Sequence, residues 1–319
     1  MRILTKVAFV VLSTCSLALA TLAPVASAQW LPEEVIFHTS DPDRVCVGDA
    51  ATASWSPPAD VPRLTGYRVV AMLFTENPPW TFIDELVPLE QTTLNFTAPF
   101  GYSSFFIYAV TPEGEGEPFA GGIFFAGKAP ATARWNQEGA TVGNGTAAVP
   151  FIWYGTNELY NNGGLDSTVR VTASPGGARL DIPANSTATF TGLTNGVAYT
   201  FSAVTYNACG WSSDTDISPT YVPGIAPTWT RSTPPLEVSR GQYVYKFAAK
   251  GDPAPTYELV NAPSWLTISP NGLVKGRPPA GTTSFSYSVL ARNGVGIPFF
   301  QDLDIVTGPF TVTVRSPGR

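Results

Sequence analysis

The sequence carries little charge. Of its 319 residues, 13% are charged, which is about half the ~25% typical of globular proteins. Long amphipathic helices and coiled coils need charged residues along their solvent faces, so this composition argues against a helical protein. The formal net charge of −6 leaves no Lys- and Arg-rich face for nucleic acid or for an anionic membrane surface, and neither partner is expected.

Histidine is almost absent, and this scarcity excludes several classes of enzyme. His38 is the single histidine, so one chain cannot supply two histidine ligands to zinc or iron. The spacings G-x-S-x-G, H-E-x-x-H and that of the P-loop are also missing. We interpret His38 as a surface residue of an edge strand, and we expect a protein that is not an enzyme and has no cofactor.

Carboxylate pairs are the remaining route to catalysis, as in glycosidases, which need two acids ~5–10 Å apart. Glu113, Glu115 and Glu117 alternate with glycines in an expected loop. A solvated loop does not hold two carboxyl groups at different pKa values. A solvated loop tip is therefore the favoured interpretation, and a carboxylate-dependent glycosidase is the disfavoured one.

No calcium-binding motif is present in the sequence, and calcium binding remains an alternative without a motif to support it. Asp214 and Asp216 alternate in the chain, as do Asp302 and Asp304. Neither pair has the dense spacing of oxygen ligands that defines a calcium loop. The sequence thus predicts no metal ligand.

Glycine, proline and aromatic residues are abundant. The chain has 29 Gly and 30 Pro, and 12% of its residues are aromatic, a content that disordered chains lack. Tyr199, Phe201 and Ala203 alternate with polar residues, and the same period of two recurs at 243–247, 285–291 and 310–314. Such alternation between turn signals is typical of half-buried antiparallel strands. We therefore predict an all-β protein built from antiparallel sandwiches.

The first 28 residues have the layout of a secretory signal peptide. A basic start precedes an apolar stretch at 7–20 and the small residues 26–28, which predicts cleavage before Gln29. A lipoprotein signal at Cys15 is disfavoured because the apolar stretch continues past it. No later apolar run reaches the ~20 residues of a membrane-spanning helix, so we expect a secreted, extracellular product without membrane insertion.

Two segments rich in proline and small residues, 127–130 and 222–227, interrupt the alternation. They divide the remaining chain into 29–127, 128–223 and 224–319, each about the size of one sandwich. Short proline-containing linkers form stiff joints rather than free tethers.

The middle segment carries motifs of a known family. Residues 171–177, 190–203 and 207–212 closely resemble a fibronectin type III domain, in which the last of these stretches ends strand F and opens the FG loop. Residues 29–127 look like a more divergent copy. Phe105 stands there at the position where the family has a corner tyrosine.

The last segment resembles a different family. Residues 262–282 are similar to the signature of putative-Ig, cadherin-like repeats of bacterial surface proteins. Together the resemblances imply three tandem immunoglobulin-like sandwiches for extracellular binding, spacing or adhesion, and a fold alone fixes none of these functions.

Two cysteines remain after signal removal, Cys46 and Cys209. The resemblance puts Cys46 at the end of strand A in the first module and Cys209 in the FG loop of the second, at poles that face each other. We propose a disulfide between the modules. Free buried thiols and pairing between chains are the alternatives, and a Cα separation beyond ~7 Å would eliminate the bond.

Aromatic side chains in expected loops are the best functional candidates. Flat rings beside amide groups suit stacking on a pyranose, and they equally suit a protein partner. The predicted stacking residues are Trp80, Trp153, Tyr154, Tyr160 and Trp211. The competing interpretation is that Trp153 and Tyr154 cap their sandwich against its neighbour.

The sequence therefore predicts a non-catalytic adhesion or binding protein whose partner is an extracellular protein or a polysaccharide. A carbohydrate-binding accessory to secreted polysaccharide hydrolases is the first alternative. The sequence determines neither the ligand nor the oligomeric state.

Overall fold

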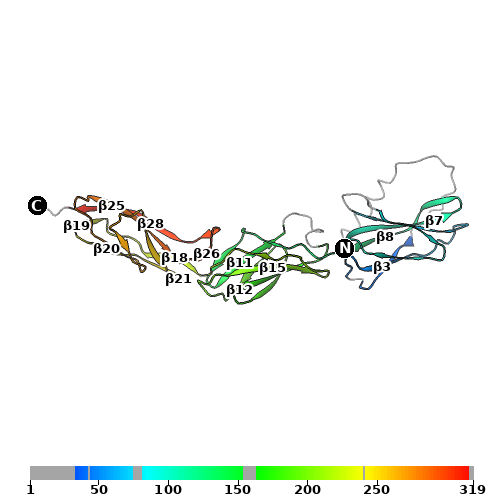
Figure 1. Cartoon of the computed structure of the whole chain (residues 1–319), viewed down its shortest axis with the longest axis horizontal. Helices are drawn as coiled ribbons and strands as arrows, with labels where there is room; N and C mark the ends of the chain where they lie inside the picture. Colours follow the sequence, from blue (N-terminus) through cyan, green and yellow to red (C-terminus); the bar gives the residue numbers. More distant parts are fainter. Residues whose placement is uncertain (1–32, 42–43, 75–80, 154–162, 240, 316–319) are drawn as a thin grey trace.

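The computed structural model describes residues 33–41, 44–74, 81–153, 163–239 and 241–315. Every regular element in these ranges is a β-strand, and the strands form three sandwiches that follow one another end to end (Figure 1). The prediction of three tandem immunoglobulin-like antiparallel sandwiches is confirmed. The signal segment 1–28 lies outside the described residues. The described part contains no helix long and apolar enough to cross a membrane.

The first module packs a five-stranded sheet, β1-β8-β7-β4-β5, against a three-stranded sheet, β2-β3-β6. Its core is aromatic: Phe105 is fully buried, and its ring centroid lies 4.9 Å from that of Phe96 and 5.0 Å from that of Phe37. The strands are β1 (Glu33–Glu34), β2 (Ile36–Thr39), β3 (Ala50–Ser54), β4 (Gly66–Leu73), β5 (Thr81–Pro88), β6 (Thr93–Thr97), β7 (Gly101–Thr111) and β8 (Gly114–Ala126).

The second module has one sheet in the order β10-β11-β14, with β9 also paired to β11, and a facing sheet in the order β13-β12-β15-β16, with β17 also paired to β15. The predicted alternation holds, because Phe201 and Ala203 are fully buried and Tyr199 is nearly so. The strands are β9 (Arg134–Trp135), β10 (Thr141–Gly143), β11 (Thr146–Ile152), β12 (Thr168–Ser174), β13 (Arg179–Pro183), β14 (Ser186–Phe190), β15 (Thr200–Asn207), β16 (Gly210–Trp211) and β17 (Asp216–Ile217).

The third module is built around the sheet β19-β28-β25-β22, with β20-β24-β23 facing it. Tyr243 and Tyr287 meet in its core, their hydroxyl oxygens 2.8 Å apart, and burial raises the pKa of both phenols. The strands are β18 (Ile225–Arg231), β19 (Glu237–Ser239), β20 (Tyr243–Lys246), β21 (Ala248–Asp252), β22 (Thr256–Val260), β23 (Thr267–Ile268), β24 (Leu273–Gly276), β25 (Ser284–Arg292), β26 (Gly296–Ile297), β27 (Gln301–Asp302) and β28 (Ile305–Arg315).

A disulfide joins the first module to the second. Cys46 and Cys209 are bonded with a Cα separation of 5.5 Å, across 163 residues of sequence. The linker packs beside this bond: the Lys128 N–H donates to the Gly163 carbonyl at 2.9 Å, and the Asn207 side chain donates to the Lys128 carbonyl at 2.7 Å. Covalent and polar contacts thus fix the same joint.

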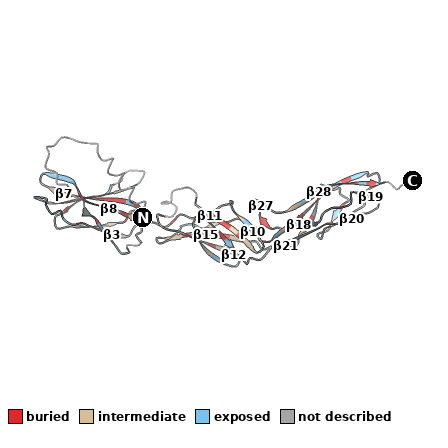
Figure 2. Ribbon diagram, turned by 180° about the vertical axis from the view of Figure 1, so that it is seen from behind, coloured by how far each residue is buried: buried red, intermediate tan, exposed pale blue. Residues whose placement is uncertain are grey.

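The hairpin β26–β27 lies at the joint between the second and third modules (β27 is labelled in Figure 2). Ile297 of this hairpin is fully buried in the core of the second module. Two backbone hydrogen bonds of 2.9 and 3.1 Å pair Val222 with Gly296. The ring of Phe300 meets that of Trp135 edge-on at 4.9 Å. The third module therefore completes the core of its neighbour, which the sequence analysis did not foresee.

We expect Ile297→Ala to destabilise the second module although the residue belongs to the third. Removing a buried isoleucine side chain leaves a cavity, and such changes cost about 2–5 kcal/mol of unfolding free energy. Urea denaturation monitored by fluorescence measures the loss. Phe299→Ala, two residues away at the fully exposed hairpin tip, is the matched control and should change stability by less than about 0.5 kcal/mol.

Removing the disulfide tests the first joint. In the double variant Cys46→Ser, Cys209→Ser each sandwich keeps its own core, so the circular dichroism spectrum should stay unchanged while the joint gains freedom. Small-angle X-ray scattering should then show a broader distribution of interatomic distances. Identical scattering from the two proteins would show that the linker contacts alone hold the joint.

Candidate functional site

Four side chains from four neighbouring strands form one row on the outer face of the second module. We call Asp181 on β13, Arg170 on β12, Tyr206 on β15 and Trp211 on β16 the platform. Both sequence neighbours of Arg170 are buried, so the pleat directs Arg170 outward. The register places Arg170 opposite Asp181 and Tyr206 opposite Trp211.

The guanidinium of Arg170 links the acidic end of the platform to its aromatic end. Its Nε donates to Asp181 Oδ1 at 2.8 Å and its Nη2 to Asp181 Oδ2 at 2.7 Å. Its carbon lies 5.1 Å from the ring centroid of Tyr206 and 5.1 Å from that of Trp211, within cation–π range. The two rings are 4.5 Å apart at an interplanar angle of 37°. The contacts with Arg170 and Tyr206 therefore hold Trp211 in place.

Asp181 receives a third hydrogen bond, from the Tyr206 hydroxyl to Oδ2 at 3.1 Å. The hydrogen bonds from Arg170 are the main cause that holds the pKa of Asp181 below its usual range, and burial opposes them. The hydrogen bonds with Asp181 in turn raise the pKa of Arg170. The carboxylate is thus charged and engaged at neutral pH.

An open hollow of about 490 Å³ adjoins the platform. Asp181 and Tyr206 form one side of it, and Asp166, Thr168 and Pro183 are among the residues that line the rest. Trp211 at the end of the platform is 51% exposed. The arrangement therefore offers a half-exposed indole packed on Tyr206, which in turn lines a hollow of mixed polar and apolar character.

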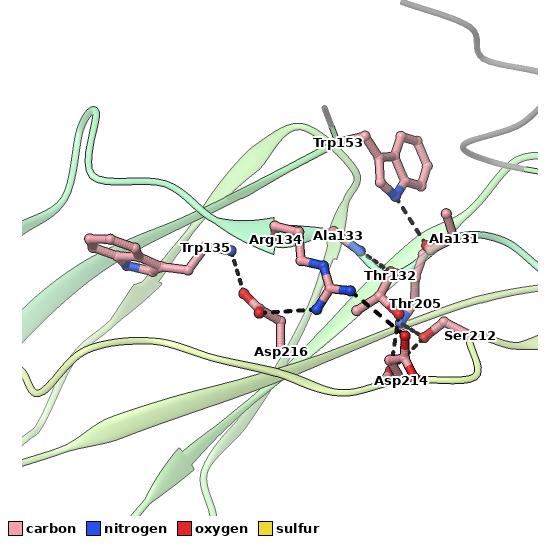
Figure 3. Close-up of polar contacts among 10 residues, drawn as sticks. All are labelled: Ala131, Thr132, Ala133, Arg134, Trp135, Trp153, Thr205, Ser212, Asp214 and Asp216. Carbon is pink, nitrogen blue, oxygen red and sulfur yellow. Dashed lines mark hydrogen bonds and ion pairs between the residues drawn. The ribbon is translucent and has the colours of Figure 1, made fainter. Parts of the chain in front are cut away.

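Trp211 is the predicted stacking residue that the structure places on this platform. Trp153 lies elsewhere: it is half-buried against the core of the second module. Its indole N–H donates to the Ala131 carbonyl at 3.1 Å (Figure 3), and its backbone N–H donates to the Asn185 side chain at 2.8 Å. Trp153 thus packs on the core of its own sandwich. Within the described ranges the two tryptophans share no contact. Trp80, Tyr154 and Tyr160 lie outside the described residues.

Two of the four aspartates considered for calcium, Asp214 and Asp216, are engaged by an arginine. Arg134 contacts Asp216 at 3.3 Å and Asp214 at 3.7 Å (Figure 3). The backbone N–H of Ala133 donates to the Thr205 hydroxyl at 3.0 Å. This network ties the start of the second module to β15 and to the segment that follows the platform.

The glutamates considered for catalysis belong to the β7–β8 hairpin. The expected loop is wrong at this point, because Glu115 and Glu117 lie within β8 and only Glu113 lies in the turn. The pairing of β8 with β7 extends this hairpin. Arg63 contacts Glu113 at 2.6 Å and Arg68 contacts Glu115 at 2.9 Å. Glu113 is therefore paired with Arg63, and Glu115 shares Arg68 with Asp84.

His38 is exposed on β2, the edge strand of its sheet, as expected. Its Nε2 lies 2.8 Å from the Ser54 hydroxyl. This contact ties the ring to the neighbouring strand β3.

No model of a known protein family matches the chain, and no curated protein matches it. Many solved structures are similar to it, and three of them, all at low identity, illustrate the likeness. The chicken CNTN1 FN1–FN3 domains share 13% identity over 88% of this chain and 98% of that chain, with a TM-score of 0.32. Drosophila OTK extracellular domains 3–5 share 14% over 83% and 90%, with a TM-score of 0.38. Sidekick-1 immunoglobulin domains 1–4 share 15% over 89% and 76%, with a TM-score of 0.32.

We expect the platform to lose its stabilising effect in acid. Because Arg170 lowers the pKa of Asp181 in the folded chain, the contribution is present above the unfolded value of ~3.9. It is lost as the pH falls through the lowered folded value. Urea denaturation from pH 7 to pH 2 should show the wild type more stable than Asp181→Asn at neutral pH, with the gap closing in acid. In an Arg170→Gln background the gap should be small at every pH, and a gap that widens in acid would contradict the assignment.

Proposed function

We propose that this protein works outside the cell as a non-catalytic adhesion or binding protein, a stiff rod of three sandwiches. The single observation that carries the proposal is that both joints are fixed. A disulfide fastens the first module to the second, and Ile297 of the third module is buried in the core of the second. A rod of this kind holds a contact surface at a set distance from the rest of the chain.

Export is supported by the disulfide, because such bonds persist in oxidising compartments and are rare in the cytosol. The proposal includes removal of residues 1–28 by cleavage before Gln29. It also includes module boundaries near residues 127 and 223. The first two modules are then fibronectin type III sandwiches, and the third is of the putative-Ig, cadherin-like kind.

The surface proposed for contact is the platform, with Trp211 as its anchor. Tryptophan and arginine are enriched among the residues that dominate binding energies, and they act best where neighbouring groups hold them in place. Arg170 and Tyr206 provide this support here. Orientation before binding reduces the entropy lost on association.

The test is retention of the folded full chain on cell envelopes and on material captured from the surrounding medium. We expect retention of the wild type and a loss of about tenfold or more for Trp211→Ala, in line with the removal of an anchor side chain. Phe299→Ala removes another exposed aromatic ring far from the platform and should bind as the wild type does. A folded wild-type chain that is retained on none of these materials would contradict the proposed function.

A further inference from the structure

We infer that the platform binds a neutral polysaccharide chain, with one pyranose ring stacked on Trp211 and neighbouring hydroxyls bonded in the adjoining hollow. This inference rests on the proposed function, because it names the ligand class of the same surface.

The indole of Trp211 has the form that stacking on a sugar requires. The ring packs on Tyr206 with a centroid separation of 4.5 Å, while half of the side chain remains exposed. A pyranose presents a face of C–H groups that fits the negative face of an aromatic ring. Arg170, whose guanidinium carbon is 5.1 Å from the ring centroid, keeps the indole in place for such a contact.

The hollow that adjoins the platform at Tyr206 has acceptor oxygens in its lining, together with the apolar side chains of Ile182 and Pro183. The Tyr206 hydroxyl donates a hydrogen bond to Asp181. The lone pairs of its oxygen can therefore accept a hydrogen bond from a ligand. Asp181 Oδ1 accepts one bond from Arg170 and has capacity for a second. Asp166, whose side chain is exposed, and Thr168 add oxygen atoms to the lining. A ligand with many hydroxyl donors matches this set.

Local charge favours a neutral ligand over an anionic one. The Nε–Nη2 edge of Arg170, which could grip a carboxylate or a phosphate of a ligand, already holds Asp181 and leaves only the Nη1–Nη2 edge of the guanidinium. The exposed Arg179 acts on Asp181 as well, lowering its pKa. The carboxylates of Asp166 and Asp181 balance the two guanidiniums, so an acidic glycan or a nucleic acid gains no net attraction here.

A protein partner is the competing occupant, since tryptophan also anchors protein interfaces. The centre of a protein interface is depleted in charged residues. The hollow that adjoins the platform, however, is bordered by the carboxylates of Asp166 and Asp181. The observations therefore favour a hydroxyl-rich chain, and a protein partner becomes one outcome of the test.

The experiment measures binding of the full chain to insoluble cellulose, chitin and a neutral cell-wall glucan, and titrates soluble oligosaccharides of the glycan that retains it. We expect retention that changes little between 0.05 and 0.5 M salt, because no ion pair with the ligand is involved. Trp211→Ala should weaken binding about tenfold or more and Trp211→Phe should weaken it less. Tyr206→Phe, which keeps the ring and removes the hydroxyl, should also weaken it. Phe299→Ala should leave it unchanged.

Equal retention of Trp211→Ala and the wild type on the glycan would overturn the inference. So would retention of the wild type only on protease-sensitive envelope material and on none of the glycans, in which case the proposed function would stand and its ligand would be a protein. Retention on neither kind of material, by a chain whose circular dichroism shows it folded, would overturn both.

Discussion

Successive side chains of a β-strand point to opposite faces of the sheet, so a strand that buries one face exposes the other to solvent. This constraint determines both the cores of the modules and the residues of the candidate site. On β12, Val169 and Val171 are fully buried, which sends Arg170 to the outer face. The register that seals the core also sets Arg170 opposite Asp181. Slipping a strand by one residue would turn its buried residues to solvent. The contacts of the platform are therefore as strongly specified as the packing beneath them.

The joints add a second level of organisation. A sandwich with a closed core needs nothing from its neighbour, yet the second module takes Ile297 from the third. Its other end is bonded through Cys209 to the first module. The module that carries the platform is thus held at both ends (Figure 1). Its orientation along the rod is set by contacts that lie outside the platform itself.

Charged side chains in this protein interact mainly with neighbouring side chains of opposite charge. Arginine pairs with nearby carboxylates in the described parts of the first two modules, as Arg68 does with Asp84 and Glu115 and as Arg134 does with Asp216. Exposed pairs of this kind contribute little to stability. They do neutralise acids that would otherwise face solvent together, and this agrees with a recognition surface that relies on an aromatic ring and on hydroxyl chemistry.

The sequence by itself determined the strands and the class of fold, because period-two alternation reports which face of each strand is buried. It also indicated Trp211, which follows Gly210 in an expected loop, and the two cysteines that remain after signal removal. Tertiary structure alone decided which residues meet. The platform joins four strands whose residues lie between Arg170 and Trp211 in the sequence, and the insertion of Ile297 crosses a module boundary. Such contacts depend on register and on packing between sheets, and a local pattern along the chain contains neither.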